Sequence, residues 1–268
     1  MTDVALALDA GGTKLLAGLV TRDGTAVLRE QVPTPRDHRG CDPDLRTLAA
    51  LADRVRHRAE AAGFRVVTVG AGMPEYVRDG ALTSAEVFAW TRQPGEVLAG
   101  LGVPVAVESD VRCAALAEAR VRGDAGSLLY LSWGTGLSST LVVDGRCLTG
   151  RRGEAIALGE WPVAAAVDPS WPGNLETYAS GRGIAVRGDD AGAAEAVAHA
   201  VAALVRVLDP DVVVLGGGVG TSGGPLPARV RDVVPGLLTR TCPPPVQPAV
   251  AGADAGLLGA ALVAWEAA

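Results

Sequence analysis

The chain has 268 residues, of which 49% are hydrophobic, so it can bury a large core, and its length favours two lobes over one very large domain. Its formal net charge is -6 and its arginines are scattered, which argues against a nucleic-acid-binding surface. No apolar run approaches the roughly twenty residues that cross a bilayer, and the N-terminal residues lack a signal-peptide pattern, so we expect a soluble, cytoplasmic protein.

The four cysteines are far apart in the sequence, and no CxC or CxxC pair suggests a metal knuckle or a redox motif. We expect thiols without disulfide bonds at Cys41, Cys113, Cys147 and Cys242.

The first predicted element is a β-hairpin with a glycine turn. An apolar run at residues 4–8 leads into Asp9-Ala-Gly-Gly-Thr-Lys14, and a second apolar run follows at residues 15–20. This order predicts a strand, a tight turn and a second strand. An ordinary hairpin turn would explain the two glycines equally well.

The side chains of this turn favour a binding site for ATP. Gly11 and Gly12 allow a ligand to approach the backbone closely, and Asp9, Thr13 and Lys14 add a carboxylate, a hydroxyl and an ammonium group. These groups suit phosphate and Mg2+, with Asp9 as the candidate contact to the metal. Lys14 is also the only lysine in the chain.

The rest of the chain alternates helices and strands in two cycles. Helical periodicity predicts helices over residues 43–63, 94–101, 110–122, 191–208, 226–239 and 254–266. Apolar runs predict strands over residues 66–71, 103–108, 127–133, 138–143, 211–215 and 246–249, with turns and short strands over residues 73–92. The strand, glycine turn, strand order at residues 127–143 repeats that of the N-terminus, which predicts an internal duplication.

Six motifs occur in a fixed order along the chain: DAGGTK (9–14), VESDVRCAALAEA (107–119), LSWGTGLSST (131–140), LETYASG (175–181), VVLGGGVG (213–220) and ADAGLLGAAL (253–262). Together they resemble the ROK family of sugar kinases, repressors and open reading frames, over essentially the whole chain. The resemblance implies a duplicated, two-lobed α/β fold of the actin-like ATPase (ribonuclease H-like) type, with a ligand cleft between the lobes. We expect one lobe at residues 1–108 plus 253–268 and the other at residues 109–252.

The resemblance also bears on partners. ROK repressors carry a helix-turn-helix domain before the phosphate hairpin, and the position of Asp9 leaves no room for one, so a repressor is not expected. The family is commonly dimeric. This implies a homodimer that binds a small sugar-like molecule and no nucleic acid or membrane.

The resemblance assigns the central chemical role to Asp110. ROK kinases place a general base in a VENDVNAAA-like segment, which reads VESDVRCAA here. A carboxylate at that position can accept the proton of a hydroxyl group during phosphoryl transfer. The alternative is that Asp110 caps the helix that follows, a role that Ser109 could share.

The same resemblance assigns ATP contacts to two further glycine turns. Gly134, Thr135 and Gly136 resemble the second phosphate loop. The loop that packs against adenosine is matched by Gly216, Gly217 and Gly218. In each case an ordinary glycine turn is the alternative.

The zinc site of the family has no counterpart in this sequence. The histidine of the family's GEIGH segment is replaced by Glu160, and the cysteines of its CxCGxxGC segment are absent. We therefore expect no structural zinc. Packing must then hold the loop over residues 163–176, with Trp161, Trp171 and the prolines as candidates.

The family's sugar contacts are also changed. Ala157 replaces a glutamate that contacts sugar hydroxyls in the family, Ser109 replaces the asparagine before the base, and Glu86 replaces the asparagine of an NLxxW segment. Glu176 is retained. The carboxylates of Glu86, Glu160 and Glu176 could favour an amine-bearing ring, although Glu86 and Glu160 could equally be solvated or paired with arginines.

The altered sugar contacts bear on which of three functions is expected. Without the family's contacts, glucose hydroxyls would lack partners, at about 1–3 kcal/mol each. The first hypothesis is therefore an ATP- and Mg2+-dependent kinase that phosphorylates a hydroxymethyl group of a cyclitol or amino sugar of secondary metabolism. The alternatives are a non-catalytic nucleotide or sugar sensor with the same fold, and a conventional hexokinase or glucokinase.

Overall fold

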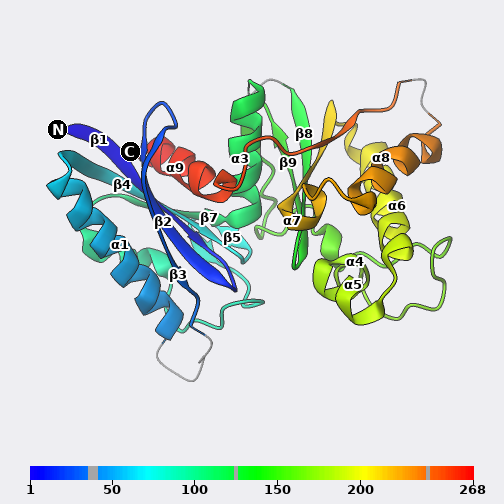
Figure 1. The fold of residues 1–268 in the computed structure, drawn as a ribbon, viewed down its shortest axis with the longest axis horizontal. Coiled ribbons are helices and arrows are strands. Elements are labelled where there is room, and N and C mark those ends of the chain that lie inside the picture. The colour runs from blue at the N-terminus through cyan, green and yellow to red at the C-terminus, as the bar shows by residue number, and fades with distance from the viewer. Residues whose placement is uncertain (36–41, 124–125, 240–241) are drawn as a thin grey trace. The chain divides into compact units, whose positions relative to one another are not determined.

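The computed structural model describes residues 1–35, 42–123, 126–239 and 242–268, which form two compact units (Figure 1). The first unit comprises Met1–Ala117, Thr149–Ala155 and Ala251–Ala268, and the second comprises Glu118–Leu148 and Ile156–Val250. Each unit contains a five-stranded sheet and a hydrophobic core of its own.

The sheet of the first unit has the strand order β3-β2-β1-β4-β7. β1 (Thr2–Ala10) pairs antiparallel with β2 (Lys14–Thr21), which pairs antiparallel with β3 (Ala26–Pro33), and this confirms the predicted hairpin. β4 (Phe64–Met73) and β7 (Val105–Ser109) run parallel to β1 on its other side. The parallel strands therefore end at the same edge of the sheet.

The edge strand β3 is not predicted from the sequence. Its burial alternates between half-buried and exposed residues, and only Leu28 and Val32 pack against the core. Arg29 and Glu30 interrupt the apolar pattern on which the sequence prediction depends. A charged edge strand of this kind also resists pairing with other chains.

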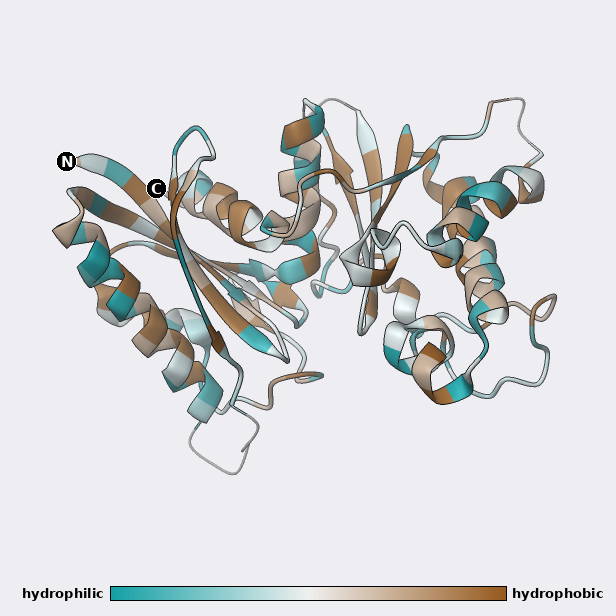
Figure 2. Ribbon diagram, in the orientation of Figure 1, coloured by the Kyte–Doolittle hydropathy of each residue, from teal (hydrophilic) through white to brown (hydrophobic). Residues whose placement is uncertain are grey.

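The alternation of side chains along β1 gives the first unit a core on each face of its sheet. Leu6 and Leu8 pack with α1 (Pro43–Ala61), whereas Ala7, between them, packs with α9 (Ala255–Ala267). Figure 2 shows the mixture of hydrophobic and hydrophilic residues along α1 that is expected of a helix with one face on a sheet. Both helices confirm predicted elements.

Glycines bring α9 into very close contact with its neighbours. A Cβ atom on Gly70 of β4 would lie 1.8 Å from the carbonyl oxygen of Ala260 in α9. A Cβ atom on Gly259 would lie 1.7 Å from the carbonyl oxygen of Cys113 in α3 (Asp110–Arg122). No side chain larger than hydrogen fits at either position, so these glycines fix how closely α9 packs on β4 and α3.

The division between the units differs from the boundary expected at residues 108 and 109. The first part of α3, as far as Ala117, belongs to the first unit. The physical reason is the close contact between Cys113 of α3 and Gly259 of α9.

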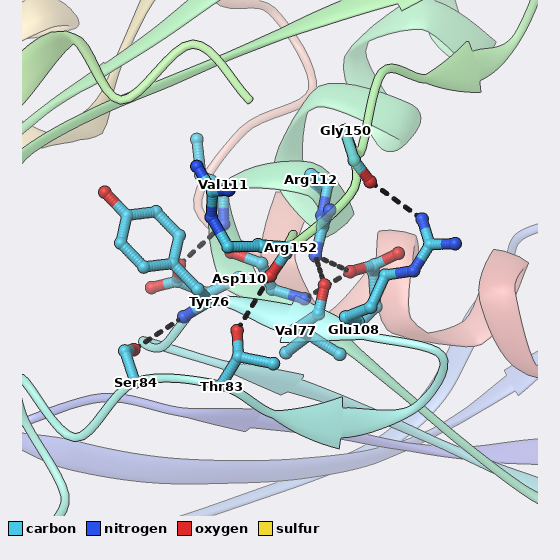
Figure 3. A network of polar contacts seen from close by, with 12 residues as sticks. Tyr76, Val77, Thr83, Ser84, Glu108, Asp110, Val111, Arg112, Gly150 and Arg152 are labelled. Atoms are coloured by element: carbon cyan, nitrogen blue, oxygen red, sulfur yellow. Dashed lines mark hydrogen bonds and ion pairs between the residues drawn. The ribbon is translucent and has the colours of Figure 1, made fainter. Parts of the chain in front are cut away.

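A loop from the middle of the sequence also belongs to the first unit. Thr149–Ala155 lies against the hairpin of β5 (Val77–Arg78) and β6 (Ala81–Leu82). The Arg78 guanidinium donates to the carbonyl oxygen of Gly150 (2.7 Å), and the Thr83 hydroxyl donates to that of Arg152 (3.0 Å; Figure 3). These two polar contacts leave no periodic pattern in the sequence, so the position of this loop is not predicted from it.

The sheet of the second unit repeats the arrangement of the first. Its order is β10-β9-β8-β11-β12, with antiparallel pairing from β10 to β8 and parallel pairing from β8 to β12. The strands are β8 (Ser127–Trp133), β9 (Leu137–Val143), β10 (Arg146–Cys147), β11 (Val212–Gly216) and β12 (Val246–Pro248). The shared order agrees with the predicted internal duplication.

The helices of the second unit surround a core of leucine, valine and alanine side chains. They are α4 (Leu175–Ala179), α5 (Gly181–Arg187), α6 (Asp190–Leu208), α7 (Gly217–Gly220) and α8 (Pro225–Leu237). Among the helices that the structure describes, α6 alone has the length and apolar composition to cross a membrane. Residues such as Val197, Val201 and Val205 of α6 are buried in the core, which accounts for this composition.

Gly259→Ala should destabilise the first unit, because the added methyl group would overlap the carbonyl oxygen of Cys113 and force α3 and α9 apart. We expect the free energy of unfolding in urea to fall by about 3 kcal/mol or more. Gly100→Ala is the matched control, because a methyl group there would meet no atom within 4 Å. Similar stability of the two variants would contradict this packing.

Candidate functional site

The predicted phosphate hairpin forms a tight turn between β1 and β2. The Gly11 N–H donates to the carbonyl oxygen of Lys14 (2.9 Å), and the Thr34 N–H donates to that of Thr13 (3.1 Å). The turn is therefore closed by its own backbone and by a residue just after β3. Gly12, Thr13 and Lys14 are exposed, so they can meet an anion.

Asp9 lies at the end of β1, against the start of α9. A Cβ atom on Gly256 would come within 2.7 Å of its carboxylate, so a larger residue there would displace the side chain of Asp9. Burial raises the pKa of Asp9, the charge of Lys14 lowers it, and the charge of Asp254 raises it. A carboxylate oxygen beside an exposed glycine turn is the type of ligand that Mg2+ prefers.

Asp110 is the first residue of α3 and directly follows the buried Ser109, the last residue of β7. Its carboxylate accepts a hydrogen bond from the N–H of the next residue, Val111 (2.6 Å), whereas an N-cap side chain accepts from the N–H two or three residues further on. Burial, followed by the charges of Asp9 and Glu75, raises the pKa of Asp110, and the bond from Val111 opposes this rise, so that the pKa lies at about 7. A carboxyl group that titrates near neutral pH is suited to accepting a proton.

A buried ion pair fixes the junction between β7 and α3. Arg112 lies 2.6 Å from the carboxylate of Glu108 and also donates to the carbonyl oxygen of Val77 (Figure 3). Burial raises the pKa of Glu108, and Arg112 lowers it. The pair ties the first turn of α3 to β5, and so it orients the helix that begins at Asp110.

Glu75 is a part of this site that sequence reasoning missed. It lies two residues after the end of β4, its side chain is buried, and its charge acts on Asp110. No motif marks it. The only signal in the sequence is a carboxylate in an otherwise apolar and glycine-rich stretch that ends a strand.

In the second unit, the two predicted nucleotide loops lie next to each other. The Gly134 N–H donates to the carbonyl oxygen of Gly136 (3.0 Å), which closes a tight turn between β8 and β9. A Cβ atom on Gly134 would lie 3.6 Å from the backbone nitrogen of Gly218. Thr135, Gly136 and Gly218 are exposed, so both loops can contact a ligand at this edge of the sheet.

The second of these loops differs from the glycine turn that the sequence predicts. Gly216 ends β11, and Gly217, with a φ of +74°, begins the short helix α7. A Cβ atom on Gly217 would lie 2.5 Å from the carbonyl oxygen of Trp133, and one on Gly216 would lie 2.0 Å from the hydroxyl of Tyr130. Glycine is required at both positions because the chain turns from strand to helix against β8.

The three carboxylates predicted near the acceptor occupy different places. Glu86 is an exposed residue of the first unit. In the second unit, Glu160 is exposed at the end of a 3-10 turn, and Glu176 accepts a hydrogen bond from the Leu137 N–H (3.2 Å) beside Gly136. The structure therefore brings Glu176 to the glycine turn between β8 and β9.

Aromatic side chains hold the loop over residues 163–176. Trp161 and Trp171 pack against the core, and the Trp171 ring meets the Tyr178 ring edge-on with the centroids 5.1 Å apart. The guanidinium carbon of Arg187 lies 3.4 Å from the centre of the Tyr178 ring. The tryptophans thus act as expected, but the expectation for the prolines is wrong, because they are exposed at positions 162, 169 and 172.

Sulfur and metal chemistry are limited within the described ranges. Cys113, Cys147 and Cys242 form no disulfide bonds, and Cys41 lies outside the described residues. No group of three or more His, Cys, Asp or Glu side chains among the described residues is placed to hold a metal ion.

The purified protein should contain no stoichiometric zinc, and a chelator that spares Mg2+ should leave its melting temperature unchanged. The contact between Arg187 and Tyr178 should stabilise the loop without zinc. Arg187→Ala should therefore lower the free energy of unfolding by about 1–2 kcal/mol, because this contact is lost. Arg182→Ala, at an exposed position of the same helix, is the control. Elemental analysis that finds one zinc per chain would overturn this account of the loop.

Comparison with known proteins places the chain in a family. The ROK family profile matches residues 5–194 and 190–267. The bifunctional enzyme NanE/NanK of Brucella melitensis is 32% identical over 283 residues, which cover 96% of this chain and 53% of the relative, so the chain spans about half the length of that relative.

Two further relatives match along their whole length. The N-acetylmannosamine kinase of Yersinia pseudotuberculosis is 30% identical over 290 residues, which cover 96% of this chain and 97% of the relative. The crystal structure of the ROK hexokinase from Thermus thermophilus has 31% sequence identity and a TM-score of 0.79, and the match covers 98% of both chains. The α/β fold of the actin-like ATPase type expected from the sequence is confirmed, and the chain belongs to the ROK family.

Proposed function

We propose that the chain is an ATP-dependent kinase that phosphorylates a hydroxyl group of a sugar or sugar-like acceptor, with Asp110 as the general base. The observation that carries the proposal is the position of Asp110 at the end of β7, where burial and the charges of Asp9 and Glu75 raise its pKa to about 7. The kinase names of the similar proteins support it.

The residues present fit ATP and Mg2+. The exposed glycine turn at Gly11 and Gly12, with Lys14, offers backbone N–H groups and a cation to phosphates, and the carboxylate of Asp9 offers oxygen to the metal. In the second unit the glycine loops that begin at Gly134 and Gly216 would contact the nucleotide. When bound, ATP supplies the phosphoryl group and Mg2+ offsets its negative charge.

Asp110 performs the acid–base work in this proposal. Its carboxylate accepts the proton of the acceptor hydroxyl, most simply that of a hydroxymethyl group, as the oxygen becomes a nucleophile. The ion pair of Arg112 and Glu108 keeps the start of α3 in place. Proton transfer requires ionised Asp110, so the reaction should be favoured above pH 7.

The acceptor class follows from the altered sugar contacts. An amino sugar or its N-acyl derivative is the form that the relatives support best, because two of them carry N-acetylmannosamine kinase or NanK in their names. Glu176, which accepts a hydrogen bond from the Leu137 N–H beside Gly136, is the carboxylate that we assign to ligand contact, and Glu86 and Glu160 are exposed. A cyclitol is the second acceptor class in this proposal.

Two other functions remain as outcomes of an acceptor screen. A coupled ADP-release assay with hexoses, amino sugars and cyclitols distinguishes them. Tight binding of a ring compound without transfer to any acceptor would favour a sensor, and glucose as the best acceptor would favour a conventional glucokinase. The homodimer also stays a prediction, which the mass in solution would test.

Asp110→Asn should lower the rate of phosphoryl transfer by about 10² to 10⁴ while ATP binding stays nearly intact, because an amide keeps the shape but cannot accept the proton. The pKa of Asp110 rises from 3.8 to about 7 on folding, so its ionisation destabilises the protein as pH increases through this window. The variant should therefore be more stable than wild type above pH 7 and lose this advantage towards pH 4. Asp232→Asn, at an exposed position, is the control. Near-normal turnover by Asp110→Asn would show that Asp110 is not the general base.

Ala157→Glu combined with Glu160→His should shift preference towards glucose by about 1–3 kcal/mol, measured as the ratio of kcat/KM values, because one or two hydrogen bonds to sugar hydroxyls return. The two positions are joined by a bond from the Glu160 N–H to the Ala157 carbonyl oxygen (3.1 Å), so they should be changed together as well as singly. If wild type already prefers glucose, this reading of the altered contacts is wrong although the kinase assignment stands.

A further inference from the structure

An irregular segment of the first unit is held by buried carboxylates. Residues 83–93, between β6 and α2 (Pro94–Leu98), contain no helix or strand. Asp42 nonetheless fixes the far end of the segment, because it accepts hydrogen bonds from the N–H (2.8 Å) and the hydroxyl (2.7 Å) of Thr91. Stacking of Phe88 on Trp90, with ring centroids 4.5 Å apart, orders the middle.

Glu75 fixes the near end of the segment. Its side chain is 3% exposed, and its two carboxylate oxygens accept hydrogen bonds from the N–H groups of Glu86 (2.8 Å), Val87 (2.7 Å) and Phe88 (2.7 Å), and from the Ser84 hydroxyl. A buried carboxylate with four hydrogen-bond donors is well compensated. Removing its charge would leave three backbone N–H groups with a weaker partner, so the conformation of this segment depends on Glu75.

The segment is linked to two parts of the site, to Asp110 through Glu75 and to the phosphate hairpin through Val87. Glu75 and Asp110 follow neighbouring parallel strands, β4 and β7, in which Met73 pairs with Ser109, so both carboxylates lie at the same edge of the sheet. The segment also approaches the phosphate hairpin, because a Cβ atom on Gly12 would lie 3.3 Å from the side chain of Val87. The Tyr76 N–H, one residue after Glu75, also donates a hydrogen bond to the Ser84 hydroxyl (2.9 Å; Figure 3).

The segment does not close the phosphate hairpin itself. The hairpin is closed by the bonds from Gly11 to Lys14 and from Thr34 to Thr13, none of which involves residues 83–93. A change at Glu75 should therefore alter the edge of the site near Asp110 more than the phosphate turn. The role of Glu75 can therefore be tested by comparing the KM of the acceptor with the KM of ATP.

We propose that Glu75 is a positioning residue of the acceptor site: its buried carboxylate holds the segment from Ser84 to Phe88 beside Asp110, and so it sets the affinity for the acceptor and not that for ATP. The inference rests on the proposed kinase function. It assigns no chemical step to Glu75, which acts through the backbone that it orders.

Glu75→Gln tests this role, because glutamine keeps the shape and removes the charge. With N-acetylmannosamine, glucose, glucosamine and myo-inositol as acceptors, we expect the KM of the best acceptor to rise about tenfold or more and the KM of ATP to change less than about threefold. Ser84→Ala removes one of the four donors and should raise the acceptor KM by a smaller factor. Ser84→Ala is the test variant if Glu75→Gln does not fold.

Asp42→Asn is the matched control, because it neutralises a second buried carboxylate that holds the same segment, and asparagine tolerates the left-handed backbone at this position (φ 48°). It should lower the melting temperature while leaving the acceptor KM within about twofold of wild type. A merely structural role for Glu75 predicts equal effects of the two variants on KM, and that result would overturn the proposal. An unchanged acceptor KM in Glu75→Gln would also overturn the proposal, and so would an equal rise in the KM values of the acceptor and of ATP.

The outcome for wild type separates this inference from the proposed function. If wild type transfers phosphate to none of the four compounds, the proposed kinase function fails for them, and calorimetric binding of the same compounds replaces KM. Weaker binding to Glu75→Gln by about tenfold or more would then support the positioning role. Absence of binding to wild type would overturn both.

Discussion

The candidate site depends on one constraint: parallel strands that end at one edge of a sheet bring like charges together. Asp9 lies at the end of β1, Glu75 follows β4 and Asp110 follows β7, and the charges of Asp9 and Glu75 add to burial in raising the pKa of Asp110. The hydrogen bonds to Glu75 offset part of this cost. An arrangement that opposes stability at neutral pH is typical of sites in which carboxylates carry out chemistry.

Glycine makes the rest of the architecture possible. Gly256 allows α9 to begin against the carboxylate of Asp9, and Gly259 allows the same helix to touch α3. In the second unit, Gly216 and Gly217 let the chain leave β11 against the side chain of Tyr130 and the backbone of Trp133. Several glycines here are therefore packing positions, whereas Gly12 and Gly218, in turns that could contact ATP, are exposed.

The sequence predicts the elements that bury one periodic face, such as α1 and α6, and the hairpin of β1 and β2. It does not predict β3, whose packing is weak, or the boundary within α3, which depends on a contact between distant residues. Glu75 is missed for the same reason, because hydrogen bonds from one side chain to an irregular backbone leave no pattern along the chain. Asp110 is found through a motif, whereas its raised pKa depends on neighbours that only the fold assembles.

The proposed reaction depends most on Asp110 acting as a base in a site that raises its pKa. The direct measurement is kcat/KM for the best acceptor, at saturating ATP and Mg2+, from about pH 5 to about pH 9. If Asp110 is the base, log(kcat/KM) rises with unit slope on the acid side and levels off with an apparent pKa near 7, the value to which burial and neighbouring charges raise the pKa of Asp110. A profile that stays flat down to about pH 5 would contradict it, because the base would then titrate as an ordinary aspartate.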